Sequence, residues 1–493
     1  MVFGYFPSFF YLKNGTCVVF ERPTHTKRKN CVKKSVKNFL TKQPQLYYNH
    51  RVFLNKSVKA MKRGIDIRGF IQVSGSVSSG DIMRQFEISK PTAIKLLKES
   101  NAIAIGNSVN REYALPQPIG ENGFEWNLYK VDEQANIVTL GILYSTNTGF
   151  YFDGDYPSFY GDEFKNKLFP TLPWFLYEHR PQGFIGRNIV YNLNKDFGIS
   201  KDLNSWSDAD ILRYLLRFGD DLSGSLILGD FAKDRFLQGK GIEIQENERI
   251  GKYPEFARSA MADGVPHSSA AGEQPKFCAL IRCENGTYRN VIVKFSGDMN
   301  NPVNRRWGDL LIAEHIALQV LGSYGFDIPE SQILQSQNRI FLEYNRIDRV
   351  GRYGRRGTSS LSGIDAAFIG LGSGSWANTM GKANGYFSQE DIHLAERIYN
   401  FGLAIGNTDM HFGNISFFVN RNLPFELAPI YDMLPMYYAP KSDGTLQNEA
   451  LASIPPTRES RTMAKEFWQM AIENASISDS FKLIAQKNIY ALS

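Results

Sequence analysis

The order of apolar and polar positions predicts a mixture of helices and antiparallel strands along most of the chain. Alternation of apolar and polar residues indicates strands at residues 137–143 and 149–152, and short apolar runs indicate strands at 291–295 and 340–344. Further on, the capping sequence at 388–391 opens a helix whose apolar positions recur at helical spacing: Ile392, Ala395, Ile398 and Tyr399. Such a combination of elements is typical of an α+β protein.

A small unit with its own pattern precedes these elements. Helices are expected at residues 79–86 and 91–98, and strands at 102–105 and 111–115. We expect the two helices to share one buried face, made by Ile82, Phe86, Ile94 and Leu97. This order predicts a winged helix-turn-helix, in which the start of the second helix enters the major groove of DNA. The candidate DNA contacts are the polar residues that this start leaves outward: Ser89, Lys90, Thr92 and Lys95.

The most specific chemical pattern lies between residues 406 and 432. Asp409 is followed five residues later by Asn414, and a second acidic residue, Asp432, follows a predicted strand. Protein kinases use an Asp to accept the proton of the substrate hydroxyl, an Asn five residues on to hold a metal ion, and a later Asp to hold Mg²⁺. A cluster of ordinary turn residues is the alternative, but the predicted helix before the pattern and the strands at 415–419 and 427–430 favour a catalytic loop.

A nucleotide-binding half is predicted upstream of this loop. The strand at 291–295 contains Lys294, which is placed to reach phosphate groups, although a solvated edge-strand lysine is the commoner case. Residues 267–276 are rich in small side chains, which let backbone N–H groups approach phosphate oxygens. The strand at 340–344 leads into a polar turn at 345–349, where backbone groups are expected to meet an adenine.

Together these motifs resemble the HipA-type serine/threonine kinases, the toxins of bacterial type II toxin–antitoxin systems. The resemblance spans about residues 255–490 and rests on motifs in the family's order: Ser269-x-x-Gly272-x-Gln274-x-Lys276, Ile292-Val293-Lys294, Arg346-Ile347-Asp348-Arg349, Thr408-Asp409-x-His411-x-x-Asn414 and Tyr431-Asp432. The N-terminal helix-turn-helix resembles a branch in which the toxin and a DNA-binding part share one chain. Two positions depart from the family, since Pro275 stands where an acidic residue is common and Asn345 where Glu is often found.

The resemblance implies an ATP- and Mg²⁺-dependent kinase that phosphorylates Ser or Thr of a cytosolic protein and thereby inhibits growth. It implies that Asp409 and Lys294 are catalytic, that Asn414 and Asp432 bind the metal, and that autophosphorylation of Ser269 silences the enzyme. The residues implied to bind ATP are Ala271, Gly272, Glu273, Gln274, Pro275, Lys276, Lys294, Asn345, Arg346, Ile347, His411, Asn414, Tyr431 and Asp432. The implied protein substrate is a translation component such as an aminoacyl-tRNA synthetase.

The expected fold is a two-lobed kinase preceded by two smaller units. The predicted regions are a basic tail at 1–61, the winged helix-turn-helix at 62–118, a β-rich HipA N-terminal-like module at 123–250, and kinase lobes at 251–344 and 345–493. A chain of 493 residues with 43% hydrophobic and 22% charged residues suits such a multidomain globular protein. With no bilayer-length apolar run, no signal-peptide pattern and no CxxC spacing, we expect a cytoplasmic protein with reduced thiols and no membrane partner.

The positive charge of the chain is concentrated at its start. Residues 1–64 contain 14 Lys or Arg and a single acid, Glu21, whereas the whole chain has a net charge of only +6. Such a segment can bind nucleic acid electrostatically. We favour two simpler interpretations, a tail without fixed structure or a non-native extension ahead of a true start at Met61.

Two other functions remain open on the sequence. A small-molecule phosphotransferase of the aminoglycoside-kinase type would share Asp409, Asn414 and Asp432, but the Ser269–Lys276 loop argues against it. The second alternative is a DNA-binding regulator with a catalytically silent kinase fold. The presence of Lys294, Asp409, Asn414 and Asp432 argues against this alternative. The helix-turn-helix has its own alternative, a protein-docking domain with no DNA contact.

Overall fold

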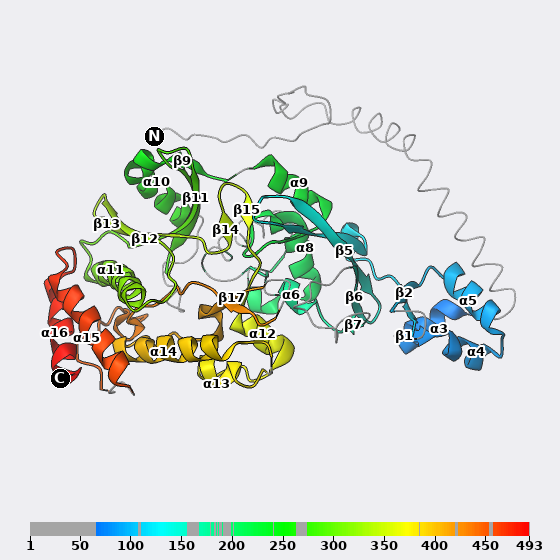
Figure 1. The fold of residues 1–493 in the computed structure, drawn as a ribbon. Helices are drawn as coiled ribbons and strands as arrows, with labels where there is room; N and C mark the ends of the chain where they lie inside the picture. The colour runs from blue at the N-terminus through cyan, green and yellow to red at the C-terminus, as the bar shows by residue number, and fades with distance from the viewer. Residues whose placement is uncertain are drawn as a thin grey trace, which may run out of the picture.

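The computed structural model describes most of the chain after residue 65. The described residues are 66–106, 110–154, 167–177, 179–181, 184, 186, 190, 199–200, 202–239, 241–262, 274–383, 385–419, 423–452 and 457–492. We refer to four parts: the winged unit (66–115), the middle unit (116–239), the upper lobe (241–345) and the lower lobe (346–492). Figure 1 shows the winged unit at one end of the molecule and the C-terminal helices at the other.

The winged unit combines three described helices with a three-stranded antiparallel sheet of order β1-β3-β2. Its elements are α3 (Ile67–Ser74), β1 (Ser76–Ser78), α4 (Ser79–Phe86), α5 (Lys90–Glu99), β2 (Ile103–Ile105) and β3 (Glu112–Ala114). The two predicted helices and both predicted wing strands are confirmed, whereas α3 was not predicted. A capping box between Ser78 and Asp81 begins α4, and Ser89 occupies the N-cap position of α5.

The predicted buried face of α5 is wrong in one position. Ala93 and Leu97 are fully buried, while Ile94 is half-buried and lies outside the apolar core of the winged unit. Ala93 and Leu97 are four residues apart and so share one side of the helix, and Ile94 is turned about 100° away from Ala93. Ala93 and Leu97 therefore face the core of the winged unit, and Ile94 does not.

The middle unit is built on a five-stranded antiparallel sheet of order β7-β6-β5-β4-β8. Its strands are β4 (Glu125–Val131), β5 (Ile137–Thr146), β6 (Gly149–Gly154), β7 (Leu168–Phe169) and β8 (Leu226–Leu228). Its helices are α6 (Trp174–Tyr177), α8 (Asp208–Phe218) and α9 (Asp230–Gln238), with short 3-10 turns η1 (Gly120–Asn122), η4 (Leu203–Ser205) and η5 (Gly219–Asp221). The strands predicted at 137–143 and 149–152 are confirmed as parts of β5 and β6.

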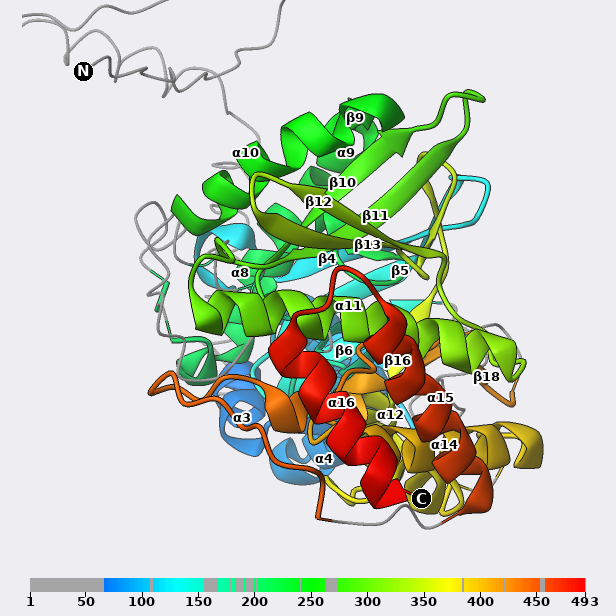
Figure 2. The ribbon, with the colours of Figure 1, turned by 90° about the vertical axis from the view of Figure 1, so that its left-hand side faces the viewer.

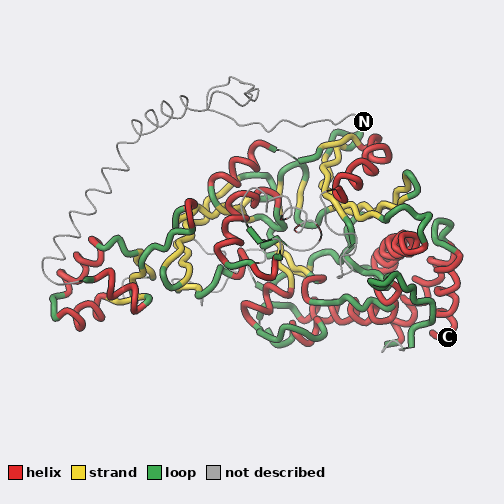
Figure 3. Tube along the Cα trace, turned by 180° about the vertical axis from the view of Figure 1, so that it is seen from behind, coloured by secondary structure: helices red, strands yellow, loops and turns green. Residues whose placement is uncertain are grey.

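The winged unit packs against this sheet and is joined to it by hydrogen bonds as well as by the connecting chain. The Asn147 side chain, in the β5–β6 turn, donates to the carbonyl oxygens of Ile71 and Gly75 and accepts from the amide of Leu115. An apolar cluster that includes Ile105 and Tyr151 joins the same two parts. Figure 3 shows from behind how the winged unit extends from this sheet, away from the C-terminal helices.

The upper lobe has a five-stranded sheet of order β12-β13-β11-β10-β9. Its elements are β9 (Glu243–Gln245), η6 (Glu246–Glu248), α10 (Arg249–Ala262), β10 (Lys276–Arg282), β11 (Tyr288–Phe295), α11 (Pro302–Ser323), β12 (Ser331–Ser336) and β13 (Arg339–Asn345). The predicted strands at 291–295 and 340–344 are confirmed within β11 and β13. Because β11 is the central strand, Lys294 is not an edge-strand lysine.

The lower lobe is mainly helical. Its helices are α12 (Leu361–Phe368), α13 (Trp376–Met380), α14 (Gln389–Ile405), α15 (Arg458–Glu473) and α16 (Asp479–Leu492), with 3-10 turns η7 (Phe412–Asn414) and η8 (Met436–Tyr438). Its short strands are β14 (Arg349–Val350), β15 (Gly354–Arg355), β16 (Thr358–Ser360), β17 (Ser416–Phe418) and β18 (Glu426–Leu427). The strand predicted at 415–419 is confirmed as β17. The strand predicted at 427–430 is wrong beyond Leu427, because the amide of Ile430 donates to Asp327 instead of to the sheet.

Helix α11 connects the two lobes. It packs against β11, β12 and β13 on one side and against α15 on the other, and Figure 2 shows it between the upper sheet and the C-terminal helices. Thirteen of its 22 residues are buried, including the charged residues Arg306, Asp309 and Glu314. The helix therefore places three charged side chains inside the protein, where each requires a polar partner.

Candidate active site

The loop that carries Asp409 begins where α14 ends. Ser388 caps the start of α14 by accepting a hydrogen bond from the amide of Asp391, and Gly406 ends the helix in the left-handed conformation, with φ 81°. The chain then turns back, and the Asn414 side-chain amide donates to the backbone oxygen of Asp409 at 2.6 Å. The Asp409 side chain is 55% exposed, so its carboxylate faces outward. The loop is thus closed on itself, with its acidic group accessible from solvent.

Asn407 ties this loop to Asp432. Its Oδ1 accepts from the amide of Asp409 at 3.0 Å, and its Nδ2 donates to the backbone oxygen of Asp432 at 3.3 Å. Asp432 itself has φ 56°, a left-handed conformation that costs an Asp residue about 1 kcal/mol or more. Such strain is concentrated at functional sites. The geometry brings Asp409, Asn414 and Asp432 together, as predicted from the sequence.

Lys294 lies between two carboxylates. Its Nζ donates to Glu314 of α11 at 2.6 and 2.8 Å, and also to Asp432. Lys294 is 2% exposed and Glu314 is fully buried. The upper sheet, the long helix and the lower lobe therefore meet at one ammonium group.

The charges at this point shift one another's pKa values. Burial lowers the pKa of Lys294, but the carboxylates of Asp432 and Glu314 outweigh burial and hold it well above its usual value. Burial raises the pKa of Asp432, but Lys294 and Lys276 outweigh burial and lower it to about 2. Burial raises the pKa of Glu314 despite Lys294. Lys294 and Asp432 are therefore charged at neutral pH.

A second lysine stands next to Lys294. Lys276 begins β10 and is directly opposite Lys294 in the antiparallel pair of β10 and β11. Residues paired in this way project from the same face of a sheet. The Gln274 side chain donates to the backbone oxygen of Phe295 at 2.7 Å, and the amide of Phe295 donates to Pro275 at 3.1 Å. These bonds hold the end of the predicted phosphate loop against the strand of Lys294. The other predicted loop residues lie outside the described residues: Ser269, Ala271, Gly272 and Glu273.

His411 and Tyr431 support the loop from two sides. His411 Nδ1 accepts from the amide of Gly413 at 3.0 Å, and its Nε2 lies 3.8 Å from the Asp409 carboxylate. The Tyr431 hydroxyl donates to the backbone oxygen of Gly413 at 3.0 Å and lies 2.6 Å from the Ser416 hydroxyl. Both predicted ATP-binding residues are thus in place to hold the conformation of residues 409–416.

The segment predicted to hold the adenine carries a buried ionic network. Arg346 and Arg349 both pair with Asp348, and both also contact Asp221 of the middle unit. The carboxylate of Asp348 accepts from the amide of Gly224 at 2.9 Å. The amides of Asn345 and Arg346 donate to Glu330 and Asn290. The Arg346 side chain therefore joins the kinase lobes to the middle unit, and nucleotide contacts by residues 345–347 would come from the remaining backbone groups.

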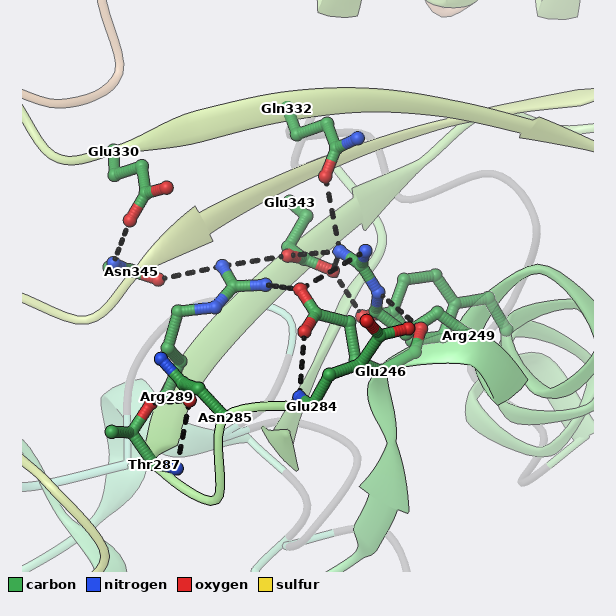
Figure 4. Close-up of polar contacts among 11 residues, drawn as sticks. Glu246, Arg249, Glu284, Asn285, Thr287, Arg289, Glu330, Gln332, Glu343 and Asn345 are labelled. Carbon is green, nitrogen blue, oxygen red and sulfur yellow. Dashed lines mark hydrogen bonds and ion pairs between the residues drawn. The ribbon is translucent and has the colours of Figure 1, made fainter. Parts of the chain in front are cut away.

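A further polar network fixes α10, the helix that precedes residues 263–273 (Figure 4). Glu343 of β13 is 1% exposed and accepts from Arg249 at 2.8 and 3.0 Å, and from Tyr253. Arg289 of β11 lies 3.1 Å from the same carboxylate. Glu343 is paired with Val293, so it projects from the sheet face opposite to that of Lys294. The network anchors the start of the chain that leads to Ser269.

Sequence reasoning missed Glu314 and Asn407. Glu314 stands alone in the apolar run Leu310–Ala317, apart from His315, and a single acid in such a run signals a buried partner. Asn407 lies next to Thr408 in a loop rich in turn residues, so its buried position gives no sequence signal. Its exposed fraction is 3%.

The predicted DNA contacts lie on one surface of the winged unit. Ser89, Lys90 and Lys95 are exposed, and the Ser89 and Thr92 hydroxyls are 2.9 Å apart. Lys90, Lys95 and Lys98 surround the partly exposed Pro91 and Ile94 on α5. This face of α5 therefore presents three lysines around a small apolar centre that Glu99 also borders.

The described residues offer neither a membrane-spanning helix nor a preformed metal cluster. None of the helices described is long and apolar enough to span a membrane. Within the same part of the chain, no group of three or more His, Cys, Asp or Glu side chains is arranged to hold a metal ion. Cys278 and Cys283 are free thiols, and Cys17 and Cys31 lie outside the described residues.

Comparison with known proteins places the chain in a family. Residues 268–490 match the HipA-like C-terminal domain, and residues 122–237 match the YjjJ-like toxin middle domain. Toxin YjjJ of Escherichia coli K12 is 32% identical over 431 residues, which cover 84% of this chain and 94% of that protein. A putative kinase of Haemophilus influenzae is 24% identical over 272 residues, or 49% of this chain and 76% of that protein.

Among solved structures, HipA of Shewanella oneidensis MR-1, determined in complex with HipB and its operator DNA, aligns with a TM-score of 0.44 and 14% identity. That alignment covers 74% of this chain and 96% of the other. The two domain matches and the long alignment with YjjJ agree with the two-lobed arrangement described above. The chain belongs to the HipA-type family of toxin kinases.

Proposed function

We propose that the chain is an ATP- and Mg²⁺-dependent protein serine/threonine kinase that acts as a toxin. The observation that carries this proposal is the position of Lys294, held by Glu314 and directed at Asp432. In protein kinases a strand lysine paired with a helix glutamate contacts the nucleotide phosphates, and a metal-binding Asp lies beside them. If Lys294 and Glu314 formed only a structural salt bridge, there would be no reason for Asp432 to adopt a strained conformation beside them.

The two opposed lysines support a polyanionic ligand. Lys276 lies directly opposite Lys294, so the two side chains project from the same face of the sheet. Lys294 is already paired with Glu314 and Asp432, and Lys276 supplies the further positive charge that a phosphate group would meet. Backbone N–H groups of the loop ending at Lys276 would add hydrogen bonds to phosphate oxygens.

Asp409 is the proposed proton acceptor. Partial burial raises the pKa of its carboxyl group, and the Asp432 charge acts in the same direction against the opposing effect of His411. In the proposed reaction the substrate hydroxyl oxygen forms a bond to the γ-phosphorus, its proton passes to Asp409, and ADP leaves. Asp409 and His411 have side chains 55% and 61% exposed, so a bulky protein can reach them. This openness favours a protein substrate over the small-molecule alternative.

The proposed metal ligands fit Mg²⁺. This ion usually takes one or two carboxylates together with substrate phosphates and water, and the described residues offer no larger protein cage. Asp432 supplies a carboxylate, and Asn414 donates through Nδ2, which leaves its Oδ1 to accept or coordinate. When bound, Mg²⁺ would neutralise charge on the phosphates.

Three finer parts of the proposal follow the family resemblance. Ser269 is the proposed autophosphorylation site, the α5 surface is the proposed DNA contact, and a component of translation in the cytoplasm is the proposed substrate. The intact site is the reason to prefer a kinase with a DNA-binding part over a silent regulator. The Lys-rich outward face of α5 is the reason to prefer DNA over protein docking.

The decisive test compares Asp409→Ala with a matched control, Asp234→Ala, whose side chain on α9 is 63% exposed. Purified proteins are incubated with labelled Mg-ATP and either a cytosolic extract or an aminoglycoside, and their expression is compared for growth arrest. We expect Asp409→Ala to lose protein phosphorylation and growth arrest by at least about 100-fold, and the control to keep both. Equal activity of the two variants would contradict the proposal, and label on the aminoglycoside alone would favour the small-molecule alternative.

A further inference from the structure

One surface loop of the lower lobe has little regular structure, but buried side chains hold it in place through several hydrogen bonds. It comprises residues 436–451, between Asp432 and α15, and includes only the short turn η8. Arg306 of α11, which is 2% exposed, donates to the backbone oxygens of Tyr438 and Gln447 at 3.2 and 2.9 Å. It also donates to the Asn448 side chain at 2.7 Å. A buried arginine thus fixes two separate points of the loop.

Helix α16 holds the same loop from another side. Asn488 donates to the Tyr438 hydroxyl at 2.7 Å and accepts from the amide of Leu451 at 2.9 Å. Lys487 donates to the backbone oxygen of Asn448 at 3.1 Å. Loops of this length without secondary structure are uncommon in compact domains and are usually functional. Fixing one in advance reduces the entropy that a partner must spend on ordering it.

The loop is attached to the proposed catalytic loop. The amide of Tyr437 donates to the backbone oxygen of Gly406 at 2.9 Å. A side chain on Gly406 would meet Leu451 at 2.7 Å and Tyr437 at 3.4 Å, so both lie directly over the start of residues 406–414. The two loops therefore form one continuous surface.

Tyr437 is the large aromatic side chain that this surface exposes. It is 36% exposed while its neighbour Tyr438 is fully buried, and its hydroxyl accepts from Gln447 at 3.0 Å. Leu403, one helical turn before Gly406, is 45% exposed. Rigid aromatic residues bounded by polar groups are the usual anchors of protein recognition.

We propose that residues 436–451 dock the protein substrate, with Tyr437 contacting an apolar side chain that flanks the phosphorylated Ser or Thr. The inference rests on the proposed kinase function. An extended polypeptide that presents a hydroxyl to Asp409 must continue past the catalytic loop, and the loop of Tyr437 adjoins it. A small phosphoryl acceptor would have no use for a fixed aromatic surface there.

The test uses Tyr437→Ala in the full chain, with Tyr490→Ala as the matched control. Tyr490 is on α16 and 87% exposed, so both variants remove an exposed tyrosine. The probes are Mg-ATP alone and Mg-ATP with a peptide library that has a fixed central Ser and randomised flanks. For Tyr437→Ala we expect an about tenfold or larger rise in KM for peptides, a lost preference for apolar flanks, and unchanged kcat and ATP hydrolysis. The control should match the wild type.

Each other outcome has a defined meaning. An unchanged peptide KM in Tyr437→Ala, or an equal rise in Tyr490→Ala, overturns the docking role. Parallel loss of ATP hydrolysis also overturns it, because the loop would then only support the catalytic centre. If the wild type hydrolyses ATP but labels no peptide above the Asp409→Ala background, docking is overturned while the phosphoryl chemistry stands. If the wild type neither binds nor hydrolyses ATP, the proposed function fails and this inference fails with it.

Discussion

Asn407 is joined to Asp432 by a hydrogen bond from its side-chain amide to the backbone oxygen, at 3.3 Å, while the same side chain accepts from Asp409 at 3.0 Å. One buried amide therefore sets the spacing between the proposed base and the proposed metal ligand. Neither contact involves a reacting atom, so Asn407 acts as a positioning residue.

Replacing Asn407 by Ala should misplace Asp432 without unfolding the lower lobe. Loss of a supporting contact to a metal ligand typically costs about 10–100-fold in affinity or activity. We expect the Mg²⁺ concentration at half-maximal ATP hydrolysis to rise and the maximal rate to fall within that range. Asn136→Ala, on the exposed β4–β5 turn, is the control. A fall in rate with unchanged Mg²⁺ dependence would assign Asn407 to general stability instead.

Lys294→Met should abolish phosphoryl transfer and also destabilise the fold. It leaves Glu314 buried without its partner, and breaking a buried ion pair from one side costs about 3–5 kcal/mol. Lys294→Met combined with Glu314→Leu should restore much of the stability in urea but no activity. The single and double variants together separate the structural role of Lys294 from its catalytic role. Activity in the double variant would show that Lys294 is not part of the active site.

Because His179 is buried in its neutral form, we expect the free energy of unfolding to fall when the pH is lowered into the mildly acidic range. Burial and then the charge of Arg355 lower its pKa to about 4, so above pH 6.5 it is neutral in both the folded and the unfolded chain. As pH falls from 6.5 to 4, the unfolded chain gains a proton that the folded chain does not, and stability is lost. The loss should approach about 3 kcal/mol.

The measurement for His179 is the unfolding midpoint of wild type and His179→Gln at pH 7 and pH 4.5. The wild type should lose more stability between the two pH values than the variant does. His393→Gln, at an exposed position of α14, should behave as wild type. Equal pH dependence of all three proteins would contradict the assignment to His179.

Lys90→Ala combined with Lys95→Ala should weaken binding to duplex DNA and reduce its salt dependence. If both lysines contact phosphates, the slope of log K against log salt should fall by about 1.8, since each contact contributes about 0.9. Fluorescence anisotropy at several salt concentrations measures this slope. Lys465→Ala with Lys482→Ala removes the same charge from the C-terminal helices and serves as the control. An unchanged slope would move the DNA site elsewhere or favour protein docking.

Ser269 should carry one phosphate after incubation with Mg-ATP. A phosphate adds about −1.5 to −2 charges near the phosphates proposed to lie between Lys276 and Lys294, so ATP affinity should fall as modification proceeds. Mass spectrometry with a parallel activity assay follows both quantities, and Ser269→Ala should show neither change. Unmodified Ser269 in an active preparation would exclude this form of regulation.

The sequence indicated those residues of the candidate site whose pattern is local, and it missed those whose contacts come from distant segments. Asp409 and Asn414 form a fixed spacing within one loop, and Lys294 ends an apolar strand, so each has a sequence signal. Glu314 lies 20 residues from its partner Lys294 in the sequence, and Asn407 lies 25 residues from its partner Asp432. Spacing within a motif cannot encode such contacts.

The same reason explains the errors in the fold. Ile94 was assigned to the core because it is apolar, but Ala93 is the residue that faces the core together with Leu97. The strand expected at 427–430 ends early because Asp327, a hundred residues upstream, takes the amide of Ile430. The adenine contacts expected from backbone groups of residues 345–347 stay a prediction, and the Arg346 and Arg349 side chains pair with Asp348 and Asp221.

Helix α11 has a thermodynamic consequence. Glu314 and Arg306 are eight residues apart, or about 12 Å along the axis, and one holds the lysine of the proposed nucleotide site while the other holds the loop of Tyr437. Coupling between two ligands that favour the same position of one helix is reciprocal. If ATP strengthens binding of a target protein by some factor, the target strengthens binding of ATP by the same factor. Both ligands would then be bound most tightly when both are present.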